Sequence, residues 1–193
     1  MTAGKAKPGD LPSRDECLRL LREHGCDVEV VGHCEAVSAL AVKIAKKCRA
    51  NVQLVEIGGL LHDIGRCRSH TMTHAVEGAK LASELKLPDS IVKIIERHIG
   101  AGITPREAEK LGLPKKDFTP RTLEEKIVAH ADNLISGSRR TGIEEAVAHI
   151  ARKGEHEAAL KVLRLHEELS KACGTNIDNI AWESTTFRGA QYP

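Results

Sequence analysis

Aromatic side chains are almost missing from this chain of 193 residues. Phenylalanine, tyrosine and tryptophan together make up 2% of it, as Phe118, Trp182, Phe187 and Tyr192. A hydrophobic core must therefore be built from leucine, isoleucine, valine and alanine, which favours helices packed on helices. The scarcity also leaves no row of aromatic rings on which nucleic-acid bases could stack.

A strong net charge and a long apolar run are absent too. Charged residues make up 29% of the chain with both signs interspersed, and the net charge is +2. Such a balance does not favour nucleic-acid or membrane binding through bulk electrostatics. No apolar stretch reaches eighteen residues, and the polar start MTAGKAKPGDLP is unlike a signal peptide. We expect a soluble cytoplasmic protein without membrane contact, and the sequence leaves its oligomeric state open.

The cysteines form no C-x-x-C pair and no zinc-ribbon spacing. The simplest interpretation is a reduced, intracellular compartment in which most of the thiols act as small buried apolar groups. The six are Cys17, Cys26, Cys34, Cys48, Cys67 and Cys173.

Apolar residues recur at three- and four-residue spacings, which predicts an all-α fold. Ser13 followed by Glu16 has the spacing of a capping box, and so has Thr122 with Glu125. No stretch alternates with period two, so strands are not expected. We predict one helical domain over residues 13–173 with seven to nine helices, after a flexible leader (1–12) and before an irregular tail (174–193). The expected helices cover about 13–25, 32–49, 52–63, 73–87, 89–100, 104–114, 119–137, 142–152 and 155–173.

The stretch LLHDIGRCRSH, residues 60–70, places His62 and Asp63 directly after an apolar run. A buried carboxylate is costly unless it is paired or bound to a metal, so the pair either closes a structural hydrogen bond or holds a cation. It falls in the last turn of an expected helix, where the helix dipole favours a cation. Histidine nitrogen with carboxylate oxygen, and no thiolate, suits Mn, Fe, Co, Ni, Zn or, less well, Mg.

Three further features complete a pattern. His33 opens the helix expected near residue 32, HDIG occupies 62–65, and Asp132 lies within the apolar segment EEKIVAHADNL. In this order they resemble the HD superfamily of metal-dependent phosphohydrolases, in its HDIG branch, over an HD core of about 30–140. The resemblance implies a helical bundle in which a divalent metal is held by His33, His62, Asp63 and Asp132.

Members of that superfamily with two metals carry extra histidines, and His74 and His98 stand where those fall. They would hold a second ion, bridged by Asp63, or donate hydrogen bonds to a phosphate. The sequence departs from the HD-GYP group, because Ile99 follows His98 and there is no Gly-Tyr-Pro. Glu29 would add a ligand only if its helix began before residue 32.

The resemblance also implies an activity, the hydrolysis of a phosphomonoester or phosphodiester in a nucleotide or at an RNA end through metal-activated water. Asp63 or Asp132 would orient that water or accept its proton. Arg66, directly after HDIG, would neutralise charge on the phosphoryl oxygens. Lys126 is a weaker candidate for substrate contact, as is Arg139, which shares the face of Asp132 only if Gly137 does not end the helix.

Two other function classes remain open. The chain could be a non-catalytic HD-type module that senses a nucleotide, or a structural helical interaction protein. The particular phosphate ester, a small molecule or an RNA end, is not specified by the sequence.

The remaining histidines and glycines have plain structural interpretations. His130 lies two residues before Asp132 and therefore points to another face. Gly58 and Gly59 are costly within a helix, and close approach of a neighbouring helix is the expected reason. We expect surface positions for His149, His156 and His166.

Overall fold

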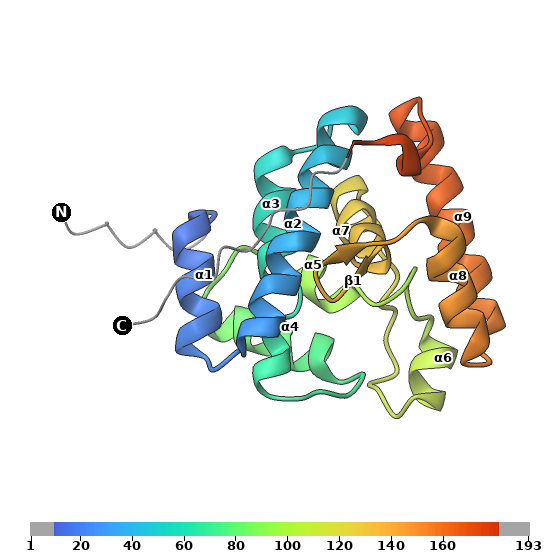
Figure 1. Ribbon diagram of the computed structural model, residues 1–193. Helices are drawn as coiled ribbons and strands as arrows, with labels where there is room; N and C mark the ends of the chain where they lie inside the picture. Colours follow the sequence, from blue (N-terminus) through green and yellow to red (C-terminus); the bar gives the residue numbers. More distant parts are fainter. Residues whose placement is uncertain (1–9, 182–193) are drawn as a thin grey trace.

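The structure, a computed structural model, describes residues 10–181 of the chain. In this part it has nine α-helices, two short 3-10 helices and one two-stranded hairpin, which confirms the all-α prediction (Figure 1). The elements are α1 (Arg14–Glu23), α2 (Val28–Cys48), α3 (Val52–Leu61), η1 (Ile64–Cys67), α4 (His74–Glu84), α5 (Asp89–Arg97), α6 (Pro105–Lys110), α7 (Leu123–Asn133), β1 (Ile135–Ser136), β2 (Arg139–Arg140), α8 (Ile143–Arg152), α9 (His156–Cys173) and η2 (Ile177–Asn179).

The longest helix, α2, runs through the middle of the bundle and packs against α3 and α7 (Figure 1). It begins at Val28, four residues before the predicted start, because the Asp27 side chain accepts a hydrogen bond from the Val30 backbone N–H. His33 therefore lies in the second turn of a helix and not at its first residue. Glu29, one turn earlier, is exposed.

Close contact with two neighbouring helices explains the glycine pair in α3, as predicted. A Cβ atom at Gly59 would lie 2.7 Å from the Cα atom of Ser38 in α2. At Gly58 it would lie 2.7 Å from the Cδ1 atom of Ile94 in α5. Only glycine lets α3 enter this far between its neighbours.

The HDIG motif contains a change of helix type. The α-helix ends at Leu61, two residues before the predicted end, and the chain tightens into η1. Gly65 does not end the helix by a left-handed turn. Instead, a Cβ atom there would lie 2.0 Å from the carbonyl oxygen of His74 and 2.5 Å from the amide nitrogen of Gly78. Gly65 is therefore required for η1 to lie directly on the first turn of α4.

A small hairpin contradicts the expectation that strands are absent. Ile135–Ser136 pairs antiparallel with Arg139–Arg140, across a two-residue loop that starts with Gly137 at φ +60°. A glycine with positive φ at this place is typical of tight hairpin turns. Because each strand has two residues, period-two alternation could not reveal it. α7 accordingly ends at Asn133 and not near Gly137.

The C-terminal helices α8 and α9 pack onto the same core as α2 and α7. A disulfide joins Cys48, at the end of α2, to Cys173, at the end of α9. The prediction that the cysteines act mainly as thiols is therefore wrong for these two. The four free ones are Cys17, Cys26, Cys34 and Cys67.

Helix starts follow the predicted caps in part. The Ser13–Glu16 capping box forms in both directions. The Thr122 side chain caps α7 by accepting a hydrogen bond from the Glu125 amide. The Glu125 carboxylate accepts instead from the Arg97 side chain and the Arg121 amide, so only one of the two hydrogen bonds of this capping box forms. Asp89, at the expected start of the fifth helix, is the first residue of α5.

The loop around α6 has a small core of its own. Ile103, Ala108, Leu113 and Phe118 form it, and Phe118 is 3% exposed. Its ring is therefore not available to stack on a base. The first nine residues of the predicted leader, and the part of the tail with Trp182, Phe187 and Tyr192, lie outside the described residues. No helix between residues 10 and 181 has the length and apolar character needed to cross a membrane.

Candidate metal centre

Four histidines and two aspartates meet where the ends of several helices come together. His33 comes from α2, while His62 and Asp63 lie between α3 and η1. The remaining three residues are the first of α4, His74; the residue after α5, His98; and Asp132 near the end of α7. The structure thus brings together the six residues that sequence reasoning had singled out as ligand candidates.

All four imidazoles are oriented in the same way. Each Nδ1 lies within hydrogen-bond distance of a backbone carbonyl oxygen, which only accepts, so Nδ1 carries a hydrogen and Nε2 is the atom that can bind a cation, either a proton or a metal ion. Such outer hydrogen bonds fix the ring and tautomer of a metal-binding histidine. The four Nδ1–O distances are 2.8 Å for His33 to Gly137, and 2.7 Å for His62 to Gly59, His74 to Thr71 and His98 to Ile95.

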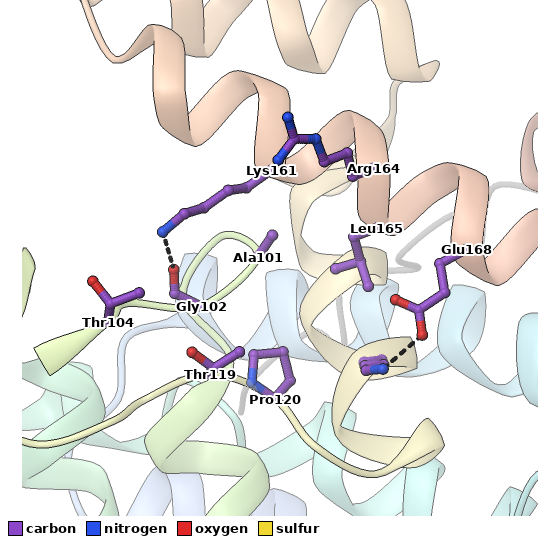
Figure 2. Close-up of a pocket in the computed structure, with 10 residues that line it drawn as sticks. Ala101, Gly102, Thr104, Thr119, Pro120, Lys161, Arg164, Leu165 and Glu168 are labelled. Atoms are coloured by element: carbon purple, nitrogen blue, oxygen red, sulfur yellow. Dashed lines mark hydrogen bonds and ion pairs between the residues drawn. The ribbon is translucent and has the colours of Figure 1, made fainter.

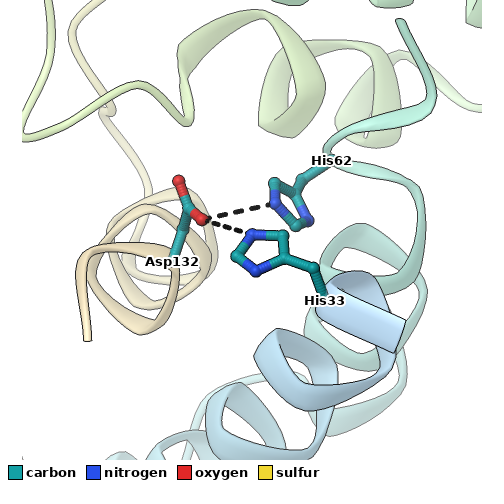
Figure 3. A group of neighbouring side chains, drawn as sticks. All are labelled: His33, His62 and Asp132. Carbon is teal, nitrogen blue, oxygen red and sulfur yellow. Dashed lines mark hydrogen bonds and ion pairs between the residues drawn. The ribbon is translucent and has the colours of Figure 1, made fainter. Parts of the chain in front are cut away.

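The first group that can hold an ion consists of His33, His62 and Asp132 (Figure 3). Asp132 Oδ1 lies 2.9 Å from His33 Nε2 and 3.5 Å from His62 Nε2. One ligand atom from each residue falls within 4.8 Å of the others. A nitrogen lone pair and a carboxylate oxygen at these distances repel each other unless a cation, a proton or a metal ion, lies between them.

A second group forms around Asp63. Its Oδ1 atom lies 3.1 Å from His74 Nε2 and 3.5 Å from His98 Nε2. Its other oxygen, Oδ2, lies 3.8 Å from His62 Nε2 and 3.9 Å from His33 Nε2. The two oxygens of this carboxylate therefore face different histidines, and each would be available to a metal ion on its own side.

Two atoms at the centre are buried without a hydrogen bond. They are His62 Nε2 and Asp63 Oδ1, in residues that are 0% and 2% exposed. A buried carboxylate oxygen and a buried imidazole lone pair are costly to leave unpaired. The donor set is nitrogen and oxygen without thiolate, which fits a divalent transition-metal ion.

The charge state of the site also favours a cation. Burial alone would lower the pKa of His62, yet the adjacent Asp63 carboxylate holds it well above the usual value. Burial alone would raise the pKa of Asp63 and of Asp132, yet the surrounding histidines hold both well below their usual values. Two ionised carboxylates therefore face the imidazoles, and positive charge between them is stabilised.

Arg66 reaches the cluster from η1. Its Nε atom lies 2.5 Å from Asp63 Oδ2, and its side chain is 34% exposed. The guanidinium is thus anchored to a ligand candidate at one side and open to solvent at the other.

The two weaker candidates for substrate contact lie elsewhere. Lys126 is six residues before Asp132 in α7, about 9 Å along the helix axis. It pairs with Glu168 at 2.6 Å in a cleft of about 320 Å³ between α7, α9 and the loop near Gly102 (Figure 2). Because α7 ends before it, Arg139 lies in β2 and does not share a helix face with Asp132. Its side chain pairs with Glu145 at 2.5 Å. Neither side chain is brought to the histidine cluster.

His130 points away from the cluster, as expected, but His166 was wrongly expected on the surface. His166 is 4% exposed, and its Nδ1 atom lies 3.0 Å from His130 Nε2. Burial lowers the pKa of His130 to about 3, so this ring packs as a neutral group. The four-residue spacing from Val162, on the apolar face of α9, could have revealed the burial of His166.

The comparisons with known proteins agree with this geometry. The sequence pattern of the HD domain matches residues 30–137, more than half of the chain. The chain belongs to the HD-domain family. HD domains bind divalent metals, and the His/Asp cluster of this one can hold such an ion.

Two relatives share close to half of their aligned residues with this HD domain. A tRNA (cytidine(56)-2'-O)-methyltransferase of Picrophilus torridus is 45% identical over 170 residues, which are 88% of this chain and 50% of the relative. The chain therefore spans about half the length of that relative. The uncharacterised protein MJ0778 of Methanocaldococcus jannaschii is 46% identical over 152 residues, 75% of this chain and 90% of the relative.

Among solved structures, the HD domain of the L. monocytogenes phosphodiesterase PgpH is similar to this one. It superposes with a TM-score of 0.56 at 18% identity and covers 84% of this chain and 95% of its own. The same domain in complex with cyclic-di-AMP gives a TM-score of 0.51 at 17% identity, covering 81% and 96%. At such identities the likeness shows the HD fold alone.

Proposed function

We propose that this HD domain is a divalent-metal-dependent phosphohydrolase that cleaves a phosphomonoester or phosphodiester of a nucleotide or an RNA end. The observation that carries the proposal is the shared orientation of the four imidazoles. Each uses its Nδ1 hydrogen on a backbone carbonyl and turns its Nε2 lone pair toward Asp63 or Asp132. Nitrogen lone pairs and carboxylate oxygens are all hydrogen-bond acceptors, so they repel each other in a buried site unless a cation lies between them.

The proposed ligands divide between two ions. His33, His62, Asp132 and Asp63 would hold the first. His74, His98 and Asp63 would hold the second, or else the two histidines would contact a substrate phosphate. The nitrogen and oxygen donors favour Mn, Fe, Co, Ni or Zn over Mg.

The proposed reaction is attack of water on phosphorus, which forms one P–O bond, breaks the P–O bond to the ester oxygen and releases that oxygen as a protonated alcohol. A bound divalent ion lowers the pKa of water and polarises the phosphoryl oxygens. Asp132, whose side chain is 23% exposed, and Asp63 are both ionised and would orient the water or accept its proton. Arg66, anchored by Asp63 and partly open to solvent, would neutralise the charge that grows on the equatorial oxygens.

Two facts support a nucleotide or RNA phosphate as substrate. The matched relative from Picrophilus torridus is named for an activity on tRNA, and the PgpH domain has been solved with cyclic-di-AMP. In this chain Phe118 is buried, so recognition would depend on phosphate groups and aliphatic surface more than on base stacking. Methyl transfer is not proposed for two reasons. This chain spans only half of that relative, and the histidines and aspartates that converge in this chain suit a cation.

The test begins with elemental analysis of protein purified without chelators. Metal-loaded protein is then assayed with bis-p-nitrophenyl phosphate, nucleotides and RNAs with terminal phosphates, using Mn, Co, Ni or Mg. Asp132→Asn keeps the size of the side chain and removes its charge. It should lose bound metal and turnover together, whereas Asp117→Asn, whose carboxylate pairs with Arg121 on the surface, should keep both. An inert wild type on all substrates, with equal metal in Asp132→Asn, would refute the proposal.

A second candidate is a nucleotide-sensing module without turnover. It is favoured by the direct contact between Arg66 and Asp63. This contact ties Arg66, the main candidate for binding the substrate phosphate, to a proposed metal ligand. Tight nucleotide binding in calorimetry, with no product on chromatography after long incubation, would establish this alternative.

A further inference from the structure

His33 differs from the other three histidines in how its ring is held. His62, His74 and His98 each donate to the carbonyl three residues earlier, within their own turn of chain. His33 donates instead to Gly137, in the hairpin loop 104 residues later. Its orientation therefore depends on where that hairpin lies.

The hairpin is fixed from two sides. On one side the Thr141 amide donates to the carbonyl of Leu134, the residue that follows α7, at 2.8 Å. On the other side, the Arg140 guanidinium donates from Nη2 to the Ile177 carbonyl at 2.8 Å and from Nη1 to the Ile180 carbonyl. Because Ile177 and Ile180 are buried in the main core, this C-terminal segment is a firm support.

The connection runs from outside the HD core to the metal centre. The family match ends at residue 137. Arg140, the helices α8 and α9, and η2 therefore lie outside the matched core. Arg140 faces Ile135 across the hairpin. One charged side chain thus links the added segment to the loop that carries the Gly137 carbonyl.

We propose that Arg140 is a positioning residue that sets the affinity of the metal centre by holding the Gly137 carbonyl against His33 Nδ1. The inference rests on the proposed function, since it requires His33 to be a metal ligand. Without Arg140 the hairpin loses one of its two supports, the His33 ring can rotate, and Nε2 is no longer presented toward Asp132. Loss of such an outer hydrogen bond typically weakens metal binding by about 10–100-fold.

The test compares Arg140→Met with Arg139→Met. Arg139 is the neighbouring residue, is exposed and pairs with Glu145, so its replacement controls for charge loss in the hairpin. Titration calorimetry with Zn or Mn on metal-free protein should show affinity for the first ion falling about 10–100-fold in Arg140→Met. Arg139→Met should match the wild type, and Arg140→Lys should lie between them.

A direct readout is the His33 side chain in nitrogen-15 NMR spectra. In the wild type loaded with Zn, the His33 Nδ1 should carry a slowly exchanging hydrogen. In Arg140→Met this protection should be lost, while the corresponding His62 signal is unchanged. Gly137→Val, which strains the positive-φ loop and leaves Arg140 in place, should change His33 in the same way.

His33→Ala separates failure of this inference from failure of the proposed function. If His33→Ala leaves metal affinity unchanged, His33 is no ligand and the proposed function is wrong at this residue. If His33→Ala weakens binding but Arg140→Met does not, the positioning role is refuted. The role is also refuted if Arg140→Met weakens binding equally in the His33→Ala background, because the effect would then be a general loss of stability.

Discussion

The Nε2 atoms of His74 and His98 lie 3.0 Å apart, although each imidazole already donates its Nδ1 hydrogen to a backbone carbonyl. Burial lowers the pKa of His98, so its ring tends to stay neutral. Two Nε2 lone pairs that face each other beside Asp63 repel one another unless a cation, a proton or a metal ion, lies between them. A second metal ion beside Asp63 would relieve this repulsion.

We predict that the double variant His74→Ala/His98→Ala lowers the metal content from two ions per chain to one. The first group, His33, His62 and Asp132, keeps its ligands and should retain its ion. The measurement is mass-spectrometric metal analysis after dialysis. His156→Ala, at an exposed position, is the control and should keep two.

A wild type with one ion per chain would contradict the prediction. His74 and His98 would then be phosphate contacts, and the double variant should raise KM for substrate without loss of metal.

Local sequence signals predicted much of the fold. The Ser13–Glu16 cap fixed the start of α1, and the paired glycines of α3 indicated the close approach of α2 and α5. The start of α2 was missed because Val28, Val30 and Val31 are β-branched and have lower helix propensity, while the Asp27 cap lacks a glutamate or glutamine three residues on.

Contacts between residues far apart in the chain could not be predicted in the same way. The ordered His, His-Asp and Asp pattern indicated four groups that do come together, and the resemblance to two-metal members added His74 and His98, because family resemblance carries long-range information. The bond from His33 to Gly137 has no such signal, since it depends on a two-residue hairpin loop. The Cys48–Cys173 disulfide joins residues 125 apart, and cysteine spacing alone does not determine pairing.

Gly65→Ala should be strongly destabilising. The added methyl group would lie 2.0 Å from the His74 carbonyl oxygen and 2.5 Å from the Gly78 amide, and backbone atoms of a packed helix cannot easily move. We expect the free energy of unfolding to fall by about 3 kcal/mol or more, at the upper end for overpacked sites, with weaker binding of the second ion through displacement of His74.

Gly58→Ala is the matched comparison for Gly65→Ala in denaturant unfolding. Its new methyl group would meet only the Ile94 side chain, which can rotate, and alanine favours a helix by about 1 kcal/mol. A smaller loss of stability is therefore expected than for Gly65→Ala. Equal losses in the two variants would show that backbone contact at Gly65 is not the cause.

The disulfide should stabilise the chain measurably. It closes a loop of 125 residues and ties α9 to the end of α2, so its loss should reduce the free energy of unfolding by about 2–4 kcal/mol. Cys48→Ser and wild type should differ by this amount without reductant and become nearly equal with it. Intact-mass analysis should show two hydrogens fewer in unreduced wild type than in reduced wild type. Unchanged mass on reduction would contradict the pairing.

An ion pair between α6 and α9 should make stability depend on acid pH. Partial burial opposes ionisation of Glu107, but Lys161 at 2.6 Å and the Thr104 cap outweigh it and lower the pKa of Glu107 from 4.5 to about 2. Since the folded pKa is the lower one, the stabilisation is complete above pH 4.5 and is lost as pH falls toward 2.

Lys161→Met should therefore destabilise the protein at pH 7 and less at pH 3, when unfolding by urea is compared at both values. Both side chains are 30% exposed, so solvent screening limits the effect at pH 7 to about 1 kcal/mol. Lys115→Met, whose partner Glu109 lies 3.3 Å away on the surface, should change stability less at either pH. A loss in Lys161→Met that is as large at pH 3 as at pH 7 would mean that packing of the lysine stem, and not the ion pair, holds the α6 loop against α9.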